Sequence, residues 1–106
     1  MLMTAPDYRE SLRAYRPQVY VDGRSVDCVA DEPALAPGVR AIGLTYDYAH
    51  RADLAPLMTA VQHTTGKTVN RFTHIFERPE DLHLKQEMQR RLGRLTGTCF
   101  QRCEAF

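Results

Sequence analysis

The chain lacks any long apolar run and any recognisable export signal. No stretch approaches the ~20 apolar residues that a transmembrane helix needs, and the opening Met1-Leu2-Met3 leads directly into polar sequence instead of a signal peptide. We therefore expect a protein of the cytoplasm that does not enter the membrane.

The chain also lacks a surplus of one charge. The sequence has fourteen Lys and Arg residues and thirteen Asp and Glu residues, for a formal net charge of +1, and its arginines are interleaved with Asp and Glu along the whole chain. Such a pattern is typical of a solvated surface and provides no basic field for a polyanion. We expect no nucleic acid among the partners.

Disulfides are not expected either, because three cysteines are an odd count in a chain without an export signal. Free or metal-bound thiols are favoured instead. The chain shows no internal repeat and no low-complexity segment. Its 106 residues, with 43% apolar and 25% charged side chains, indicate one small domain over residues 1–106.

The pattern of caps and apolar positions predicts a mainly α-helical fold with one β-hairpin. A first helix should begin after Thr4, with Pro6 in its first turn, and end before Pro17. Asp22-Gly23 lies between two short alternating runs and predicts the hairpin. Further helices are expected over residues 39–50, over 54–62 with Asp53 as cap, and from Pro79 onward, the last being the longest.

The segment between the last two helices, residues 63–76, reads as extended or irregular chain. It contains Gly66-Lys67-Thr68, which matches the end of a phosphate-binding loop. That loop needs a glycine five residues before Gly66, where this chain has Val61, and no buried strand precedes it. We reject nucleotide binding through this loop.

An apolar stripe on the last helix leads toward two cysteines. Successive spacings of three or four residues place six side chains on one face of a continuous helix: Leu84, Met88, Leu92, Leu95, Cys99 and Cys103. The thiols then either extend a core stripe, which the spacing alone favours, or bind a metal or cluster, since residues i and i+4 lie about 5–6 Å apart at Cβ. The flanking Gly93 and Gly97 suggest close approach of another backbone or a ligand.

This chain is not expected to complete a metal site with the two thiols. A tetrahedral zinc site and an iron–sulfur cluster normally take four ligands, and the remaining candidates are Cys28, His50, His63, His74 and His83. His83 lies about 24 Å from Cys99 along one helix, and the other histidines have no telling spacing. Cys28 is predicted to be a small hydrophobic residue of the hairpin.

The whole chain resembles the N-terminal region of the 4-hydroxybutyryl-CoA dehydratase family, within the 4-hydroxyphenylacetate 3-hydroxylase-like flavoproteins. Three long segments show the resemblance: MTAPDYRESLRAYRPQVYVDGRSV, LMTAVQHTTGKTVNRFTHI and PEDLHLKQEMQRRL, followed by TGTCFQRC. It implies the N-terminal helical domain of an acyl-CoA-dehydrogenase-like flavoprotein. It also implies FAD, an acyl-CoA substrate and a [4Fe–4S] cluster whose ligands include Cys99 and Cys103, with a His and a Cys from farther downstream.

The implied reaction is dehydration of 4-hydroxybutyryl-CoA to crotonyl-CoA, together with isomerisation of vinylacetyl-CoA. Gln101 is a speculative contact to flavin or substrate. Arg90 and Arg91 are candidates near the acyl-CoA, although a solvated surface role is favoured for both. Because Glu104-Ala105-Phe106 departs from the family pattern, we expect a truncated member that is inactive alone and holds neither cofactor stably. The remainder of the enzyme, or a homo-oligomer, is the expected partner.

Two other readings stay open. The first is a fragment of an FADH2-dependent 4-hydroxyphenylacetate 3-monooxygenase-like enzyme, a branch that lacks the cysteine pair. The second is a non-catalytic helical remnant or binding module whose cysteines belong to the core. A further departure from the family is Arg78, which replaces a small capping residue before the last helix.

Overall fold

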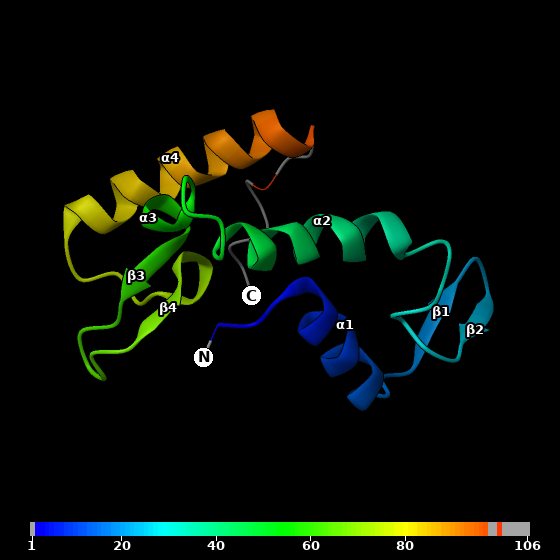
Figure 1. Ribbon diagram of the computed structural model, residues 1–106. Helices are drawn as coiled ribbons and strands as arrows, with labels where there is room; N and C mark the ends of the chain where they lie inside the picture. The colour runs from blue at the N-terminus through cyan, green and yellow to red at the C-terminus, as the bar shows by residue number, and fades with distance from the viewer. Residues whose placement is uncertain (1, 98–99, 101–106) are drawn as a thin grey trace. The chain divides into compact units, whose positions relative to one another are not determined.

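The computed structural model describes residues 2–97 and residue 100 (Figure 1). Those residues form a mainly helical chain with two small antiparallel hairpins, in place of the single hairpin expected. The chain divides into two compact units. Residues 3–47 form the N-terminal unit, and residue 2 with residues 48–97 and 100 belongs to the C-terminal unit.

The first helix of the N-terminal unit, α1 (Ala5–Ala14), confirms the predicted cap. The Thr4 hydroxyl accepts the Asp7 N–H at 3.3 Å, and the Asp7 carboxylate accepts the Thr4 N–H at 3.0 Å. This reciprocal pair satisfies two donors that a helix start otherwise leaves without partners. The helix ends at Ala14, before Pro17, as predicted.

The predicted hairpin is also confirmed. Strands β1 (Val19–Val21) and β2 (Arg24–Val26) pair antiparallel around Asp22 and Gly23. Both turn residues have positive φ, 51° and 77°, the conformation that an Asp-Gly turn supplies at low cost. Arg24 pairs with the buried carboxylate of Glu32 across the connector that follows, so the hairpin is tied to residues eight positions later.

Helix α2 (Ala36–Tyr48) begins three residues earlier than predicted. Pro37 lies in the first turn of α2, where proline is tolerated, so the helix includes the end of the predicted connector. Within the N-terminal unit, α2 packs closely on α1, because a Cβ on Gly43 would lie 3.2 Å from the Cβ of Ala5. Ala5 N–H donates to Asp47 at 2.7 Å, which links the start of α1 to the end of α2.

The C-terminal unit departs most from the prediction. The helix expected over 54–62 is the single turn α3 (Ala55–Met58), after which β3 (Thr59–Val61) pairs with β4 (Thr68–Asn70). Asp53 does not cap α3: Leu54 holds that position, and Asp53 pairs with Arg51 at 2.8 Å. Thr59, Val61 and Val69 are β-branched, so pairing with β4 overrides the apolar helical spacing.

Gly66 belongs to the connection of this second hairpin. Its φ of 68° lies in the left-handed region, and its N–H donates to the Gln62 carbonyl at 2.8 Å. The Gly-Lys-Thr tripeptide is therefore a hairpin connection that leads into β4, which agrees with the rejection of a phosphate loop.

The last helix, α4 (Pro79–Thr96), begins at the predicted proline. Arg78 provides no side-chain cap, but Asp81 Oδ2 accepts the N–H groups of Glu77 and Arg78 at 3.0 and 3.1 Å. Helix α4 packs against α3 (Figure 1). Five apolar residues that are at most 2% exposed form the core of this unit: Leu54, Met58, Met88, Leu92 and Phe100.

Candidate functional site

The predicted apolar stripe is confirmed in the middle of α4. Met88 and Leu92 are 0% and 1% exposed, and Leu84 is half-buried. Leu95 differs, with 44% of its surface exposed. The four-residue spacing therefore identifies core positions in the middle of the helix and fails near its C-terminal end.

The continuous helix expected from Leu84 to Cys103 is wrong. Helix α4 ends at Thr96, and Gly97 adopts a left-handed conformation with φ 68° while its N–H donates to the Gly93 carbonyl at 2.9 Å. A glycine in this conformation directly after a helix is a common stop. Cys99, Gln101 and Cys103 lie outside the described residues, so their assignment stays a prediction.

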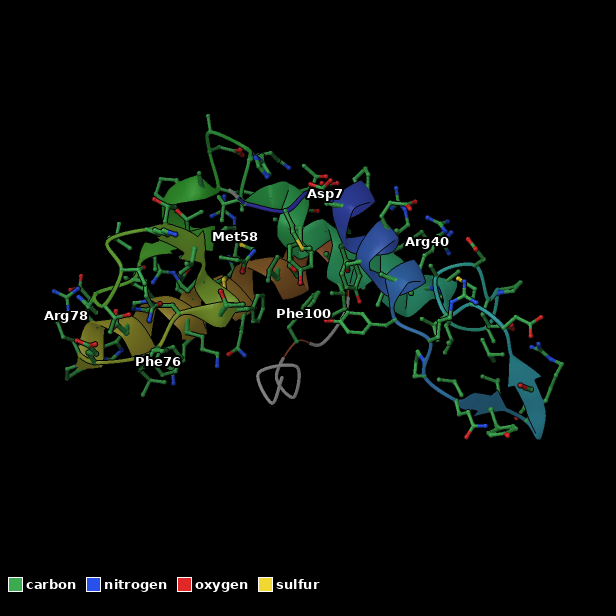
Figure 2. All side chains as sticks on the ribbon, turned by 90° about the horizontal axis from the view of Figure 1, so that it is seen from below. Asp7, Arg40, Met58, Phe76, Arg78 and Phe100 are labelled. Atoms are coloured by element: carbon green, nitrogen blue, oxygen red, sulfur yellow. The ribbon has the colours of Figure 1, made fainter. Side chains whose placement is uncertain are left out.

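Phe100 is the residue that sequence reasoning missed. It lies 2% exposed in the C-terminal unit, its ring centroid is 6.2 Å from that of Phe72, and its carbonyl accepts the Gln89 amide at 3.2 Å. Figure 2 shows Phe100 beside the ribbon of α4. Phe100, a residue of the TGTCFQRC segment, therefore belongs to the core of the C-terminal unit. A single large apolar side chain among polar neighbours was the available signal.

A buried arginine supports the same unit. Arg71, 4% exposed, donates through Nε to the Leu57 carbonyl and through Nη2 to the Thr59 carbonyl, both at 2.6 Å. It belongs to the short 3-10 helix η1 (Arg71–Thr73). Burial lowers the pKa of Arg71, and the charge of Asp81 opposes that shift. This side chain fastens η1 to α3 and β3.

A polar cluster lies near the start of α4. His74 Nε2 is 3.2 Å from Asp81 Oδ1, and both side chains are almost fully buried. Backbone N–H groups of Glu77 and Arg78, with His74, lower the pKa of Asp81 to about 2 against the cost of burial. His63 and His74 have ring centroids 5.6 Å apart. The sequence named both histidines without any spacing to connect them.

The other predicted residues remain apart from this cluster. Cys28 is a free, half-buried thiol that follows β2. Arg13 chiefly, and then the Cys28 thiol, lower the pKa of the Asp31 carboxyl by hydrogen bonding. His50 and His83 are exposed. Arg90 and Arg91 are exposed as well, and Arg90 pairs with Glu87 at 3.1 Å.

Residues 4–106 match the family model described as 4-hydroxyphenylacetate 3-hydroxylase N terminal. The chain belongs to this family. Over 103 residues it is 42% identical to the 4-hydroxybutyryl-CoA dehydratase/vinylacetyl-CoA-Δ-isomerase of Clostridium aminobutyricum, with 97% of this chain and 21% of that protein covered. The recognised resemblance to the N-terminal region of the dehydratase is confirmed.

Solved structures agree on the fold. An oxygen-tolerant archaeal 4-hydroxybutyryl-CoA dehydratase from N. maritimus matches 97% of this chain and 20% of its own at a TM-score of 0.85 and 46% identity. The oxygenase component of 4-hydroxyphenylacetate 3-monooxygenase, solved with FAD and 4-hydroxyphenylacetate, covers 86% of this chain and 19% of its own, with a TM-score of 0.70 and 22% identity. The latter likeness shows the fold alone.

The chain spans about a fifth of the length of these relatives. Among the described residues, no helix is both long enough and apolar enough to cross a membrane.

Proposed function

We propose that this chain is the N-terminal part of a flavin- and [4Fe–4S]-dependent enzyme of the 4-hydroxybutyryl-CoA dehydratase/vinylacetyl-CoA isomerase type. The supporting observation is the 42% identity to such an enzyme over 97% of the chain. The whole protein would have the acyl-CoA-dehydrogenase-like plan, with this chain as its N-terminal helical domain, and would act on an acyl-CoA.

The two cysteines of the last segment are ligands of the type that a [4Fe–4S] cluster takes, but they are fewer than the cluster needs. Thiolates are the usual ligands of a [4Fe–4S] cluster, which normally takes four protein ligands. Cys99 and Cys103 would provide two, and the other two would come from the remainder of the enzyme. When bound, the cluster supplies a Lewis acid for the departing hydroxyl of the substrate.

The described residues would position those thiols. Gly97 ends α4, and the buried Phe100 anchors the backbone within the segment that contains both cysteines. Gln89 adds a hydrogen bond to the Phe100 carbonyl. A ligand-bearing segment held at both its start and its interior loses less conformational entropy when it binds. In this proposal Phe100 is a positioning residue.

A chimera tests the proposal. Residues 4–106 would replace the matching N-terminal region of the Clostridium aminobutyricum dehydratase, and the product would be assayed for dehydration, iron and flavin. We expect an active, iron-containing flavoprotein. Cys99→Ser and Cys103→Ser should each lose iron and activity, whereas the matched control Cys28→Ser should keep both.

Two outcomes would overturn the proposal. A chimera that binds flavin but holds no iron would remove the cluster assignment. A chimera that hydroxylates 4-hydroxyphenylacetate would favour the monooxygenase alternative, to which this chain is 22% identical.

The chain alone provides a second, independent test. We expect no measurable FAD binding and at most weak iron retention after reconstitution with iron and sulfide, because half of the ligands are absent. Cys99 and Cys103 should react rapidly with a thiol reagent and Cys28 more slowly, as site-resolved mass spectrometry would measure. Protection of Cys99 and Cys103 in the cluster-free monomer while Cys28 is labelled would instead make the pair core residues.

A further inference from the structure

Three metal-ligating side chains meet in the C-terminal unit. His63 follows β3, His74 follows η1, and Asp81 lies in the first turn of α4. One nitrogen from each histidine and one oxygen from Asp81 all lie within 4.8 Å of one another. Residues 11 and 7 positions apart in sequence are thus brought to one point by the hairpin and the helix start.

The hydrogen bonds of His74 place two acceptor atoms opposite each other at that point. His74 Nδ1 lies 3.3 Å from Gln62 Oε1, and the same oxygen accepts the Ile75 N–H at 3.4 Å. With Gln62 Oε1 as the acceptor of both contacts, the hydrogen is assigned to Nδ1. In a neutral imidazole, Nε2 then directs a lone pair at Asp81 Oδ1, 3.2 Å away. Two acceptors at that distance require a cation between them, either a second proton or a metal ion.

The separation suits a metal ion. Zinc binds imidazole nitrogen at about 2.0–2.1 Å and carboxylate oxygen at about 2.0–2.2 Å, so tetrahedral geometry places such ligand atoms roughly 3.3–3.5 Å apart. The observed 3.2 Å is close to that value. Gln62 holds the other nitrogen of His74, as an outer partner of a metal-bound histidine usually does. The exposed His63 can complete the set by rotating its side chain.

The surroundings leave room for a fourth ligand. A pocket of about 290 Å³ is lined by all three side chains and by six other residues: Ala60, Val61, Arg71, Arg78, Glu80 and Leu84. The two arginines offset Asp81 and Glu80, so the pocket has no net charge that attracts cations in general. Affinity must come from direct coordination, and two imidazoles favour zinc-like ions over Mg²⁺ or Ca²⁺.

We propose that His63, His74 and Asp81 bind a divalent transition-metal ion of the zinc type, with a water molecule in the fourth position. The ion would join the β3–β4 hairpin, the segment after η1 and the start of α4, and so stabilise the C-terminal unit. This site uses no thiol and does not depend on the proposed dehydratase function.

Cobalt titration of the metal-free full chain tests the proposal, since Co²⁺ reports its ligands by absorption. We expect one equivalent to bind, with visible bands of a four- or five-coordinate ion and without a sulfur-to-cobalt charge-transfer band. Zinc should displace it and raise the melting temperature. His63→Ala should weaken binding by at least about tenfold, the lower end of what even an outer partner contributes.

Matched variants separate the outcomes. His83→Ala removes another exposed histidine on α4 and should leave binding unchanged, as should the double variant Cys99→Ser/Cys103→Ser. His74→Gln should abolish binding, and if its burial prevents folding, the exposed His63 decides the question. Absence of Co²⁺ binding at submillimolar concentration, binding insensitive to His63→Ala, or binding lost only with the thiols would each overturn the proposal and leave a His74–Asp81 ion pair.

Discussion

Replacing Arg71 should measurably destabilise the C-terminal unit. Its guanidinium makes two bonds of 2.6 Å to the carbonyls of Leu57 and Thr59 and a longer one of 3.4 Å to that of Pro56. Arg71→Met keeps an unbranched, flexible side chain and removes every donor. The two short bonds involve a charged donor, and each contributes about 1.5–3 kcal/mol.

The variant no longer buries a charge, but it leaves the carbonyls of Leu57 and Thr59 without this donor, and both effects enter the net change. Burial lowers the pKa of Arg71, because desolvation acts against its cationic form, and the charges of Asp81 and Glu80 oppose that shift. Because the removal of the buried charge and the loss of the donor oppose each other, we expect a loss of about 2–4 kcal/mol in the free energy of unfolding, a large part of the stability of a small domain.

Urea denaturation followed by circular dichroism at 222 nm measures this loss. The midpoint should fall while the slope with urea stays the same, since the surface exposed on unfolding does not change. The control is Arg94→Met, at an exposed position on α4, where we expect a change within about 0.5 kcal/mol. If both variants lie within that range, the bonds of Arg71 do not support the fold and the reasoning is refuted.

Three further predictions follow from single residues. Gly97→Ala should destabilise the chain by roughly 1 kcal/mol, because the φ of Gly97 is 68°. Gly38→Ala should instead stabilise the chain by about 0.4–1 kcal/mol, because Gly38 lies in α2 with no atom near its Cβ position. Equal shifts in the melting temperature of the two variants would contradict this prediction. Asp81 has a folded pKa of about 2, below the usual 3.8, so its contribution to the free energy of unfolding is complete above the unfolded pKa and is lost as pH falls from about 4 toward 2. Urea titrations of Asp81→Asn should therefore show a weaker loss of stability over this pH range, and an unchanged pH dependence would count against the prediction. Phe100→Ala should cost about 3–5 kcal/mol as a core truncation and lower the iron content of the chimera, and normal iron there would exclude a positioning role.

Local sequence was sufficient wherever neighbouring residues provide the partners. Thr4 and Asp7 cap α1, Asp22-Gly23 turns the first hairpin, and Pro79 opens α4, because each depends on atoms within a few positions. The core positions Met88 and Leu92 also followed from helical spacing. Gly97 ends α4 in a left-handed conformation, so the i, i+4 spacing of the cysteines does not extend the helix beyond Thr96.

Tertiary contacts decided the rest. Residues 59–61 have helical spacing, yet they form a strand because β4 supplies hydrogen bonds that no local pattern announces. Phe100 is buried through contacts with Gln89 and Phe72, which lie 11 and 28 positions away. His63, His74 and Asp81 lack any motif spacing, and only the hairpin and the start of α4 bring them within 4.8 Å. Sequence by itself determined the elements whose stabilising atoms are local, and the tertiary structure determined which distant side chains share one site.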